Sequence, residues 1–142
     1  MSDWRSEYTS FAFDKLRYAD TDRQGHVNNA LFNVFLETGR VEFLYAGSQG
    51  PLHADDGEFV IVSLELQLEG EIRWPGRVDI GTRVARVGKS SITLEQGIFQ
   101  DDRRTATAKT VIVHIDSNKR SSSPLPEATA AQLKKMAGPA ET

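Results

Sequence analysis

The polar residues between Tyr18 and Phe32 are the part of the sequence best equipped for chemistry. They include the carboxylates Asp20 and Asp22, a glycine, a histidine and two asparagines, and they come directly before the strongest helical pattern of the chain. The first N–H groups of a helix lack partners within the helix and attract negative charge, so a helix start is a suitable place for a reaction. The same residue types are ordinary turn residues, and the local pattern leaves a purely structural role equally open.

The composition narrows the classes of protein to be considered. The 142 residues suit one domain with one core, and the net charge of -3 is spread evenly rather than gathered in the basic stripe that nucleic-acid binding requires. Without cysteine, the chain has no disulfides, cysteine nucleophiles or cysteine-ligated metals. His26, His53 and His114 have no metal-like spacing, and we predict no metal site. We find no signal peptide or membrane span and expect a cytoplasmic protein without a membrane partner.

A long helix is predicted to begin at Ala30 and to end before Gly47, a typical C-terminal stop. Its apolar residues form a broad stripe, which indicates a helix that is covered on most sides. Asn28 or Asn29 is a natural N-cap for it. Gly39 in the middle of the helix costs up to ~1 kcal/mol relative to alanine, and a close approach to a sheet would explain its presence.

Five strands and a short terminal helix are predicted around this long helix. The strands are expected over residues 9–18, 59–68, 77–87, 91–100 and 105–116, and the terminal helix over residues 125–137. Residues 59–68 alternate, so Val60, Leu64 and their alternate neighbours are expected on a buried face. A bulge is expected near Gly81, and residues 1–8 are expected to be loose. Tight turns between the later strands predict an α+β fold with a mostly antiparallel sheet, in one domain over residues 1–142 with its core at about 9–116.

The polar stretch is the first of four motifs that together form a longer pattern. They are Arg17-Tyr-Ala-Asp20-Thr-Asp22-Arg-Gln-Gly25-His26-Val-Asn28-Asn29-Ala30, Glu37-Thr-Gly-Arg40-Val-Glu42-Phe43-Leu44, Ile72-Arg-Trp-Pro75-Gly-Arg-Val-Asp-Ile80-Gly81 and Ser123-Pro-Leu-Pro-Glu127. The pattern resembles the 4-hydroxybenzoyl-CoA thioesterase-like family of hotdog-fold acyl-CoA thioesterases over about residues 10 to 135, and its first motif is the most specific. The resemblance implies a hotdog fold, in which a curved antiparallel sheet wraps around one long central helix. It also implies hydrolysis of an acyl-CoA thioester to a free acid and coenzyme A.

The resemblance assigns the chemistry to the carboxylate of Asp22, which would attack the thioester or activate water. Burial of a carboxylate away from water allows its pKa to be tuned, and N–H groups at the helix start, from Asn29 to Leu31, would hold the oxyanion at about 3 kcal/mol per donor. Asp20 is expected to hold the loop. The expected catalytic residues are Asp22, Asn29 and His26, and the expected substrate-binding residues are Gly25, Asn28, Ala30, Leu31, Phe32, Lys89, Ser90 and Ser91. The last three, in a hairpin loop, would meet the phosphates of coenzyme A.

Two other functions remain open for a chain with this pattern. One is a non-catalytic module that binds acyl-CoA or an acyl carrier. The other is a hotdog enoyl-CoA hydratase or dehydratase, which would pair a helix carboxylate such as Glu37 with a histidine that the sequence does not obviously provide. No cofactor is expected beyond the coenzyme A portion of the substrate, and the acyl group stays open. The resemblance also implies a homodimer or homotetramer, and the need to cover an open sheet edge is consistent with this.

Overall fold

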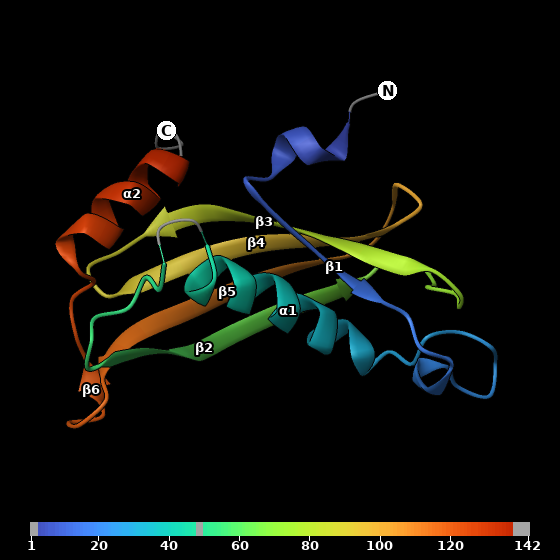
Figure 1. Cartoon of the computed structure of the whole chain (residues 1–142), viewed down its shortest axis with the longest axis horizontal. Helices are drawn as coiled ribbons and strands as arrows, with labels where there is room; N and C mark the ends of the chain where they lie inside the picture. Colours follow the sequence, from blue (N-terminus) through green and yellow to red (C-terminus); the bar gives the residue numbers. More distant parts are fainter. Residues whose placement is uncertain (1–2, 48–49, 138–142) are drawn as a thin grey trace.

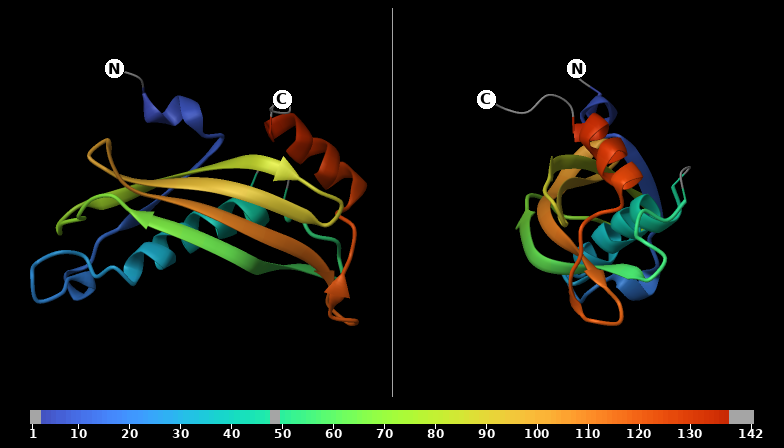
Figure 2. Two further views of the ribbon diagram at one scale, coloured as in Figure 1. Left: turned by 180° about the vertical axis from the view of Figure 1, so that it is seen from behind. Right: turned by 90° about the vertical axis from the view of Figure 1, so that its left-hand side faces the viewer.

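The computed structural model describes residues 3–47 and 50–137, and its strands form one antiparallel sheet. The strand order is β1-β3-β4-β5-β2, with β6 paired to β5. The elements are β1 (Ser10–Lys15), α1 (Leu31–Tyr45), β2 (Gly57–Leu68), β3 (Arg77–Val87), β4 (Ser91–Gln100), β5 (Arg103–Asp116), β6 (Ser121–Ser122) and α2 (Glu127–Ala137), with short 3-10 segments η1 (Trp4–Glu7) and η2 (Tyr18–Asp20). Seen from its end, the sheet curls around α1 (Figure 2). The predicted α+β architecture, a curved antiparallel sheet wrapped around one long helix, is confirmed.

The helix α1 lies close to the sheet at Gly39, as its sequence predicts. A Cβ atom at this position would lie 2.7 Å from Cγ2 of Ile80 and 2.8 Å from Nε2 of Gln96. The start of the helix differs slightly from the expectation. The side chain of Asn28 accepts the N–H of Ala30 at 3.0 Å, so Asn28 caps an irregular first turn and the regular helix begins one residue later, at Leu31.

The buried face predicted for residues 59–68 is wrong for the protomer. The side chains of Ile61, Val62, Leu64 and Leu68 are between 40% and 59% exposed. A register shift between Ile61 and Ser63 interrupts the alternation of faces, and β2 lies at the edge of the sheet, beside β5. The helix α1 packs on β1, β3 and β4 instead. The strand β2 therefore presents a row of apolar side chains along an open edge.

The N-terminal residues pack on the sheet face that points away from α1, so the expectation of loose structure is wrong for residues 3–8; residues 1 and 2 lie outside the described residues. The indole of Trp4 stacks on the ring of Phe99 with 3.8 Å between centroids. Gly81 and Gly97 pair across β3 and β4, and a Cβ atom on either would come within 2.6 Å of Tyr8. The two glycines thus make room for the Tyr8 ring. No register shift occurs at Gly81, and the predicted bulge lies instead between Val84 and Arg86.

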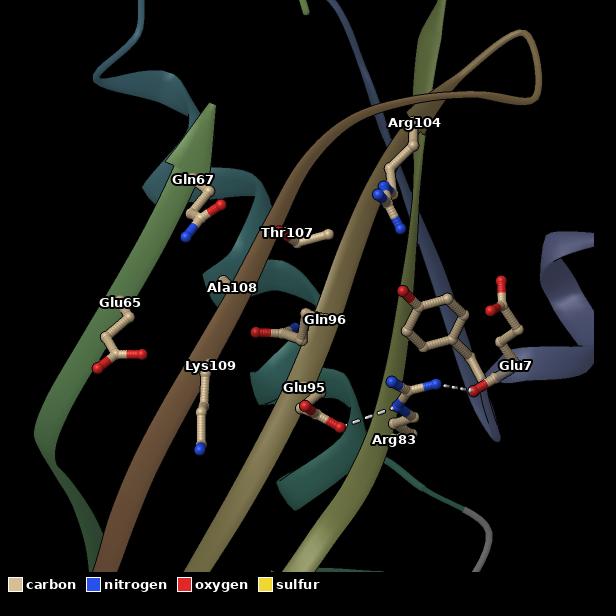
Figure 3. A pocket seen from close by; sticks show the side chains of 11 residues that line it. Glu7, Glu65, Gln67, Arg83, Glu95, Gln96, Arg104, Thr107, Ala108 and Lys109 are labelled. Carbon is tan, nitrogen blue, oxygen red and sulfur yellow. Dashed lines mark hydrogen bonds and ion pairs between the residues drawn. The ribbon is translucent and has the colours of Figure 1, made fainter. Parts of the chain in front are cut away.

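The same outer face carries a row of alternating charges. Arg83 on β3 lies opposite Glu95 on β4, Glu95 opposite Lys109 on β5, and Lys109 opposite Glu65 on β2. These side chains line a shallow hollow of about 250 Å³ (Figure 3). Burial raises the pKa of the Tyr8 hydroxyl at its rim. Opposite charges on directly paired residues stabilise a sheet, so this row gives Glu65 of β2 a structural role.

In the part of the chain that the structure describes, neither helix has the length and apolar character needed to cross a membrane.

Candidate functional site

The polar stretch folds into a tight turn that projects beyond one end of the sheet (Figure 1). Thr21 and Val27 form an antiparallel bridge at its base. Within the turn, the N–H of Asp22 donates to the carbonyl of His26 at 2.8 Å, and the N–H of Gly25 donates to the carbonyl of Asp22 at 3.1 Å. Gly25 has a φ of +82°, a left-handed conformation that glycine adopts at the least cost. The predicted glycine turn is therefore present, directly before α1.

The carboxylate of Asp22 is oriented by the backbone of its own turn. Its Oδ1 atom accepts N–H groups from Gln24 at 2.9 Å and from His26 at 3.3 Å. The residue is exposed in the protomer because the turn projects past the sheet, which contradicts the expectation of a carboxylate shielded from water. With one oxygen held by two donors, the other oxygen, Oδ2, has no hydrogen bond to any described residue and is available for a reaction.

Asp20 has the structural role that the sequence predicts. Its side chain is buried and accepts the backbone N–H of Arg17 at 2.8 Å and the guanidinium of Arg17 at 2.8 and 3.1 Å. Its carbonyl accepts the N–H of Asn28 at 2.9 Å. Asp20 thereby ties the end of β1 to the residues that begin α1, and it fixes the turn that carries Asp22.

His26 lies within a small ionic group on the other side of the turn. Its Nε2 atom is 3.3 Å from Oε2 of Glu71 and 3.4 Å from Nη2 of Arg73, and the same Glu71 oxygen accepts from Arg73 at 2.8 Å. An isolated bridge joins the backbones of His26 and Arg73. The histidine therefore holds the turn against the segment before β3.

The N–H groups at the start of α1 are partly occupied. Oxygen atoms of Asn28 accept the N–H groups of Ala30 and Leu31, and the carbonyl of Asn29 accepts that of Phe32. These hydrogen bonds leave fewer N–H groups for the oxyanion than the sequence predicted. Among the described residues, only Asn29 at this helix start keeps a free backbone N–H and a free side-chain amide.

Two groups of predicted substrate-binding residues lie elsewhere. Phe32 is 1% exposed and belongs to the core between α1 and the sheet, because it faces the sheet on the first turn of the helix. Lys89, Ser90 and Ser91 form the β3–β4 hairpin, at the opposite end of the sheet from the Asp22 turn. The eleven residues of β3 span about 33 Å. Within one protomer this hairpin therefore cannot contact a ligand held beside Asp22.

The three histidines do not converge on one point. His114 is 1% exposed, its Nε2 atom accepts the N–H of Ala54 at 3.1 Å, and its Nδ1 atom lies 3.2 Å from the carbonyl of Ser123. These contacts fix the loop before β2 and the linker after β5, far from His26. Within residues 3–47 and 50–137, no group of three histidine, aspartate or glutamate side chains is arranged to hold a metal ion.

Arg40 is a residue whose environment the sequence did not reveal. It belongs to the motif that begins at Glu37, yet it is 6% exposed, and its buried Nη1 atom has no hydrogen-bond partner among the described residues. Burial lowers the pKa of its guanidinium, and the charge of Glu37 partly offsets this effect. The broad apolar stripe of α1 predicted a covered helix but carried no signal that a cation lies under it.

Comparison with known proteins identifies the family to which the sequence is similar. Residues 16–133 match the family model described as the thioesterase-like superfamily. The curated protein "acyl-CoA thioester hydrolase YbgC" of Escherichia coli O6:H1 is 26% identical over 123 residues, which are 84% of this chain and 92% of that protein.

Solved structures share the fold over nearly the whole chain. The PA5185 protein of Pseudomonas aeruginosa strain PAO1 superposes with a TM-score of 0.82 at 25% identity, covering 96% of this chain and 97% of its own. A thioesterase of Thermus thermophilus, complexed with coenzyme A and Zn, superposes with a TM-score of 0.78 at 24% identity, covering 94% of this chain and 98% of its own.

Proposed function

The chain belongs to the thioesterase-like superfamily, and on this premise we propose that it is an acyl-CoA thioesterase with Asp22 as its catalytic carboxylate. The curated relative is named an acyl-CoA thioester hydrolase, and one of the similar structures was solved as a thioesterase complexed with coenzyme A. A thioester is a reactive acyl donor, so its hydrolysis needs a base or nucleophile and a donor for the oxyanion. The turn before α1 offers both.

The observation that carries the proposal is an anchored carboxylate in the turn that precedes α1, together with a free donor at the start of that helix. Oδ1 of Asp22 is held by two backbone N–H groups, which leaves Oδ2 to attack the thioester carbonyl or to take a proton from water. The free N–H and amide of Asn29 are the donors for the oxyanion in this proposal. His26 positions the turn through Glu71 and Arg73 and does not itself react.

We further propose that two copies pair through β2 and complete the site between them. The apolar side chains along the open edge of β2 would be covered by an equivalent strand. Two antiparallel β2 strands related by a two-fold axis bring the hairpin end of one protomer beside the Asp22 end of the other. Lys89, Ser90 and Ser91 then contact coenzyme A phosphates only across the interface. The same pairing would shield Asp22 from water.

The test is release of coenzyme A from aliphatic and aromatic acyl-CoAs, followed with a thiol-reactive dye. The chain has no cysteine, so the protein itself does not react with the dye. We expect Asp22→Asn to lose ~100-fold or more in kcat while it stays folded, since loss of a general base costs about that much. The matched control is Asp101→Asn, which removes the same charge from an exposed turn and should keep full activity.

Equal activity of wild type and Asp22→Asn would show that Asp22 is not the catalyst. If the wild type cleaves no ester but binds acyl-CoA, the protein is a binding module and the proposed function is wrong.

A further inference from the structure

The turn that carries Asp22 has few packed neighbours. It projects beyond the end of the sheet, and residues 22–25 are all exposed (Figure 1). Catalysis needs a reactive group that is held within about 0.5 Å of its working position. An exposed turn gains little of this precision from packing, so it depends on the hydrogen bonds that connect it to the sheet.

The segment before β3 is bound to this turn. The N–H of Val27 donates to the carbonyl of Ile72 at 2.8 Å, and an isolated antiparallel bridge pairs His26 with Arg73. His26 in turn donates its backbone N–H to Oδ1 of Asp22 at 3.3 Å, and its carbonyl accepts the N–H of Asp22 at 2.8 Å. The position of Asp22 therefore depends on the position of the Arg73 backbone.

The side chain of Gln100 holds that same backbone. Its Oε1 atom accepts the N–H of Arg73 at 3.0 Å, and its Nε2 atom donates to the carbonyl of Arg73 at 2.7 Å. The side-chain amide thus makes the two hydrogen bonds that a residue of a neighbouring β-strand would make. Gln100 is the last residue of β4 and is 6% exposed, so both hydrogen bonds are largely protected from water.

We propose that Gln100 is a positioning residue for catalysis, which holds Asp22 in place through the backbones of Arg73 and His26. The connection begins at a buried residue of the sheet and ends at the carboxylate in the exposed turn. This inference rests on the proposed thioesterase function, because it gives Gln100 a part in the reaction of Asp22.

The ionic group around His26 is a weaker connection between the same two segments. The side chains of Glu71 and Arg73 are 52% and 62% exposed, and exposed ion pairs contribute little to stability. Gln100 bonds only the backbone of Arg73, so its contribution does not depend on these charges. We therefore expect the buried amide to determine the position of the turn more than the ion pairs do.

The first measurement compares two buried glutamines of the same strand. Gln96 also lies on β4 and is 1% exposed, but its amide donates to the carbonyl of Leu36 in α1 rather than to the segment before β3. Gln100→Met and Gln96→Met each leave buried backbone groups without partners, and both should lower the melting temperature. Only Gln100→Met should also lower kcat for acyl-CoA hydrolysis, by about tenfold or more with little change in KM, because a small misplacement of a catalytic group is costly.

Both variants are assayed at a temperature at which each is folded. The pair Gln100→Asn and Gln96→Asn repeats the comparison if a methionine variant does not fold. Asparagine keeps the amide but is shorter by one methylene, so at position 100 it cannot make both hydrogen bonds to the Arg73 backbone.

The second measurement does not depend on turnover. Hydrogen–deuterium exchange of the peptide that covers residues 18–30 should be faster in Gln100→Met than in the wild type and in Gln96→Met. Exchange of the peptides from α1 should be unchanged in Gln100→Met. In Gln96→Met the pattern should be reversed, with faster exchange in α1 and an unchanged turn.

The outcomes separate this inference from the proposed function. If the wild type hydrolyses acyl-CoAs but Gln100→Met and Gln96→Met have equal kcat, Gln100 serves only the fold and the inference is wrong. Unchanged exchange of the turn in Gln100→Met would overturn it as well. If the wild type cleaves no ester, the proposed function fails, and exchange still decides whether Gln100 holds the turn: faster exchange supports the connection, and unchanged exchange contradicts it.

Discussion

The two edge strands of the sheet, β1 and β2, differ in how the rest of the protomer holds them. The edge strand β1 is fastened to its surroundings, because Asp14 accepts a hydrogen bond from Thr38 of α1 at 2.7 Å and Phe11 packs edge-on against Trp4. Both edges carry exposed apolar side chains, such as Phe11 at 51% and Phe13 at 58% on β1 and Leu64 at 40% on β2, but α1 packs mainly on β1, β3 and β4. An uncovered strand edge invites another strand, and the proposed pairing of two copies through β2 follows from this difference in helix cover.

Removal of the Trp4 side chain, which packs on the sheet face that points away from α1, should have the largest effect on stability. Trp4 is 7% exposed, stacks on Phe99 and donates its indole N–H to Asp102 at 3.0 Å. We expect Trp4→Ala to lower the free energy of unfolding by about 3 kcal/mol in urea titrations. Arg5→Ala breaks exposed ion pairs and removes a guanidinium that lies 4.5 Å from the centroid of the Trp4 ring, and it should cost only about 0.5–1 kcal/mol. Equal losses in the two variants would mean that the N-terminal residues do not hold the β1 side.

A charge on the open edge should separate the two copies. We expect Leu64→Lys to weaken self-association by ~100-fold or more, because each dimer would carry the buried lysine twice. The monomer should stay folded, since Leu64 is 40% exposed in the protomer. Sedimentation against protein concentration measures the effect. Phe13→Lys, on the β1 edge at 58% exposure, is the matched control and should leave the assembly unchanged. If the control dissociates the protein instead, the roles of the two edges are reversed.

The bond that fastens β1 to the helix should contribute a smaller amount. Thr38→Val keeps the shape of the side chain but leaves the carboxylate of Asp14 without its donor. We expect a loss of about 1 kcal/mol in thermal or urea unfolding. Thr107→Val removes a hydroxyl whose contact with Glu69 is 3.4 Å long, and it should be nearly neutral. A neutral Thr38→Val would show that packing alone closes this edge.

The smallest expected effect is on the pH dependence of folding stability. The indole N–H of Trp4, and next the guanidinium of Arg5, lower the pKa of the exposed Asp102 carboxyl below its ordinary value. A lowered folded-state pKa adds stability above the unfolded pKa of about 3.9, and this stability is lost as the pH falls through the folded value. Asp102→Asn should therefore reduce the difference in stability between pH 7 and pH 3 slightly, as measured by urea titrations at the two pH values. An unchanged difference would contradict the contribution of Asp102.

Local patterns predicted the elements of this fold because they depend on neighbours along the chain. The broad apolar stripe predicted α1, and Gly39 correctly indicated a close approach to the sheet at Ile80 and Gln96. The turn that carries Asp22 was predicted as well, since it needs only a glycine at a positive φ and an aspartate that accepts backbone N–H groups. The loop-holding role expected for Asp20 belongs to the same short motif.

Tertiary structure alone decided which groups are buried and which lie close together. Alternation in β2 looks the same in a central strand and at an edge, so the sequence predicted a buried face where the sheet ends. The hairpin of Lys89 to Ser91 lies at the far end of the sheet because β3 runs its whole length away from the Asp22 turn. The burial of Arg40 was invisible in the sequence for the same reason. Burial and distance are set by the packing of segments that are remote in the chain, whereas caps, turns and periodicity are set within a few residues.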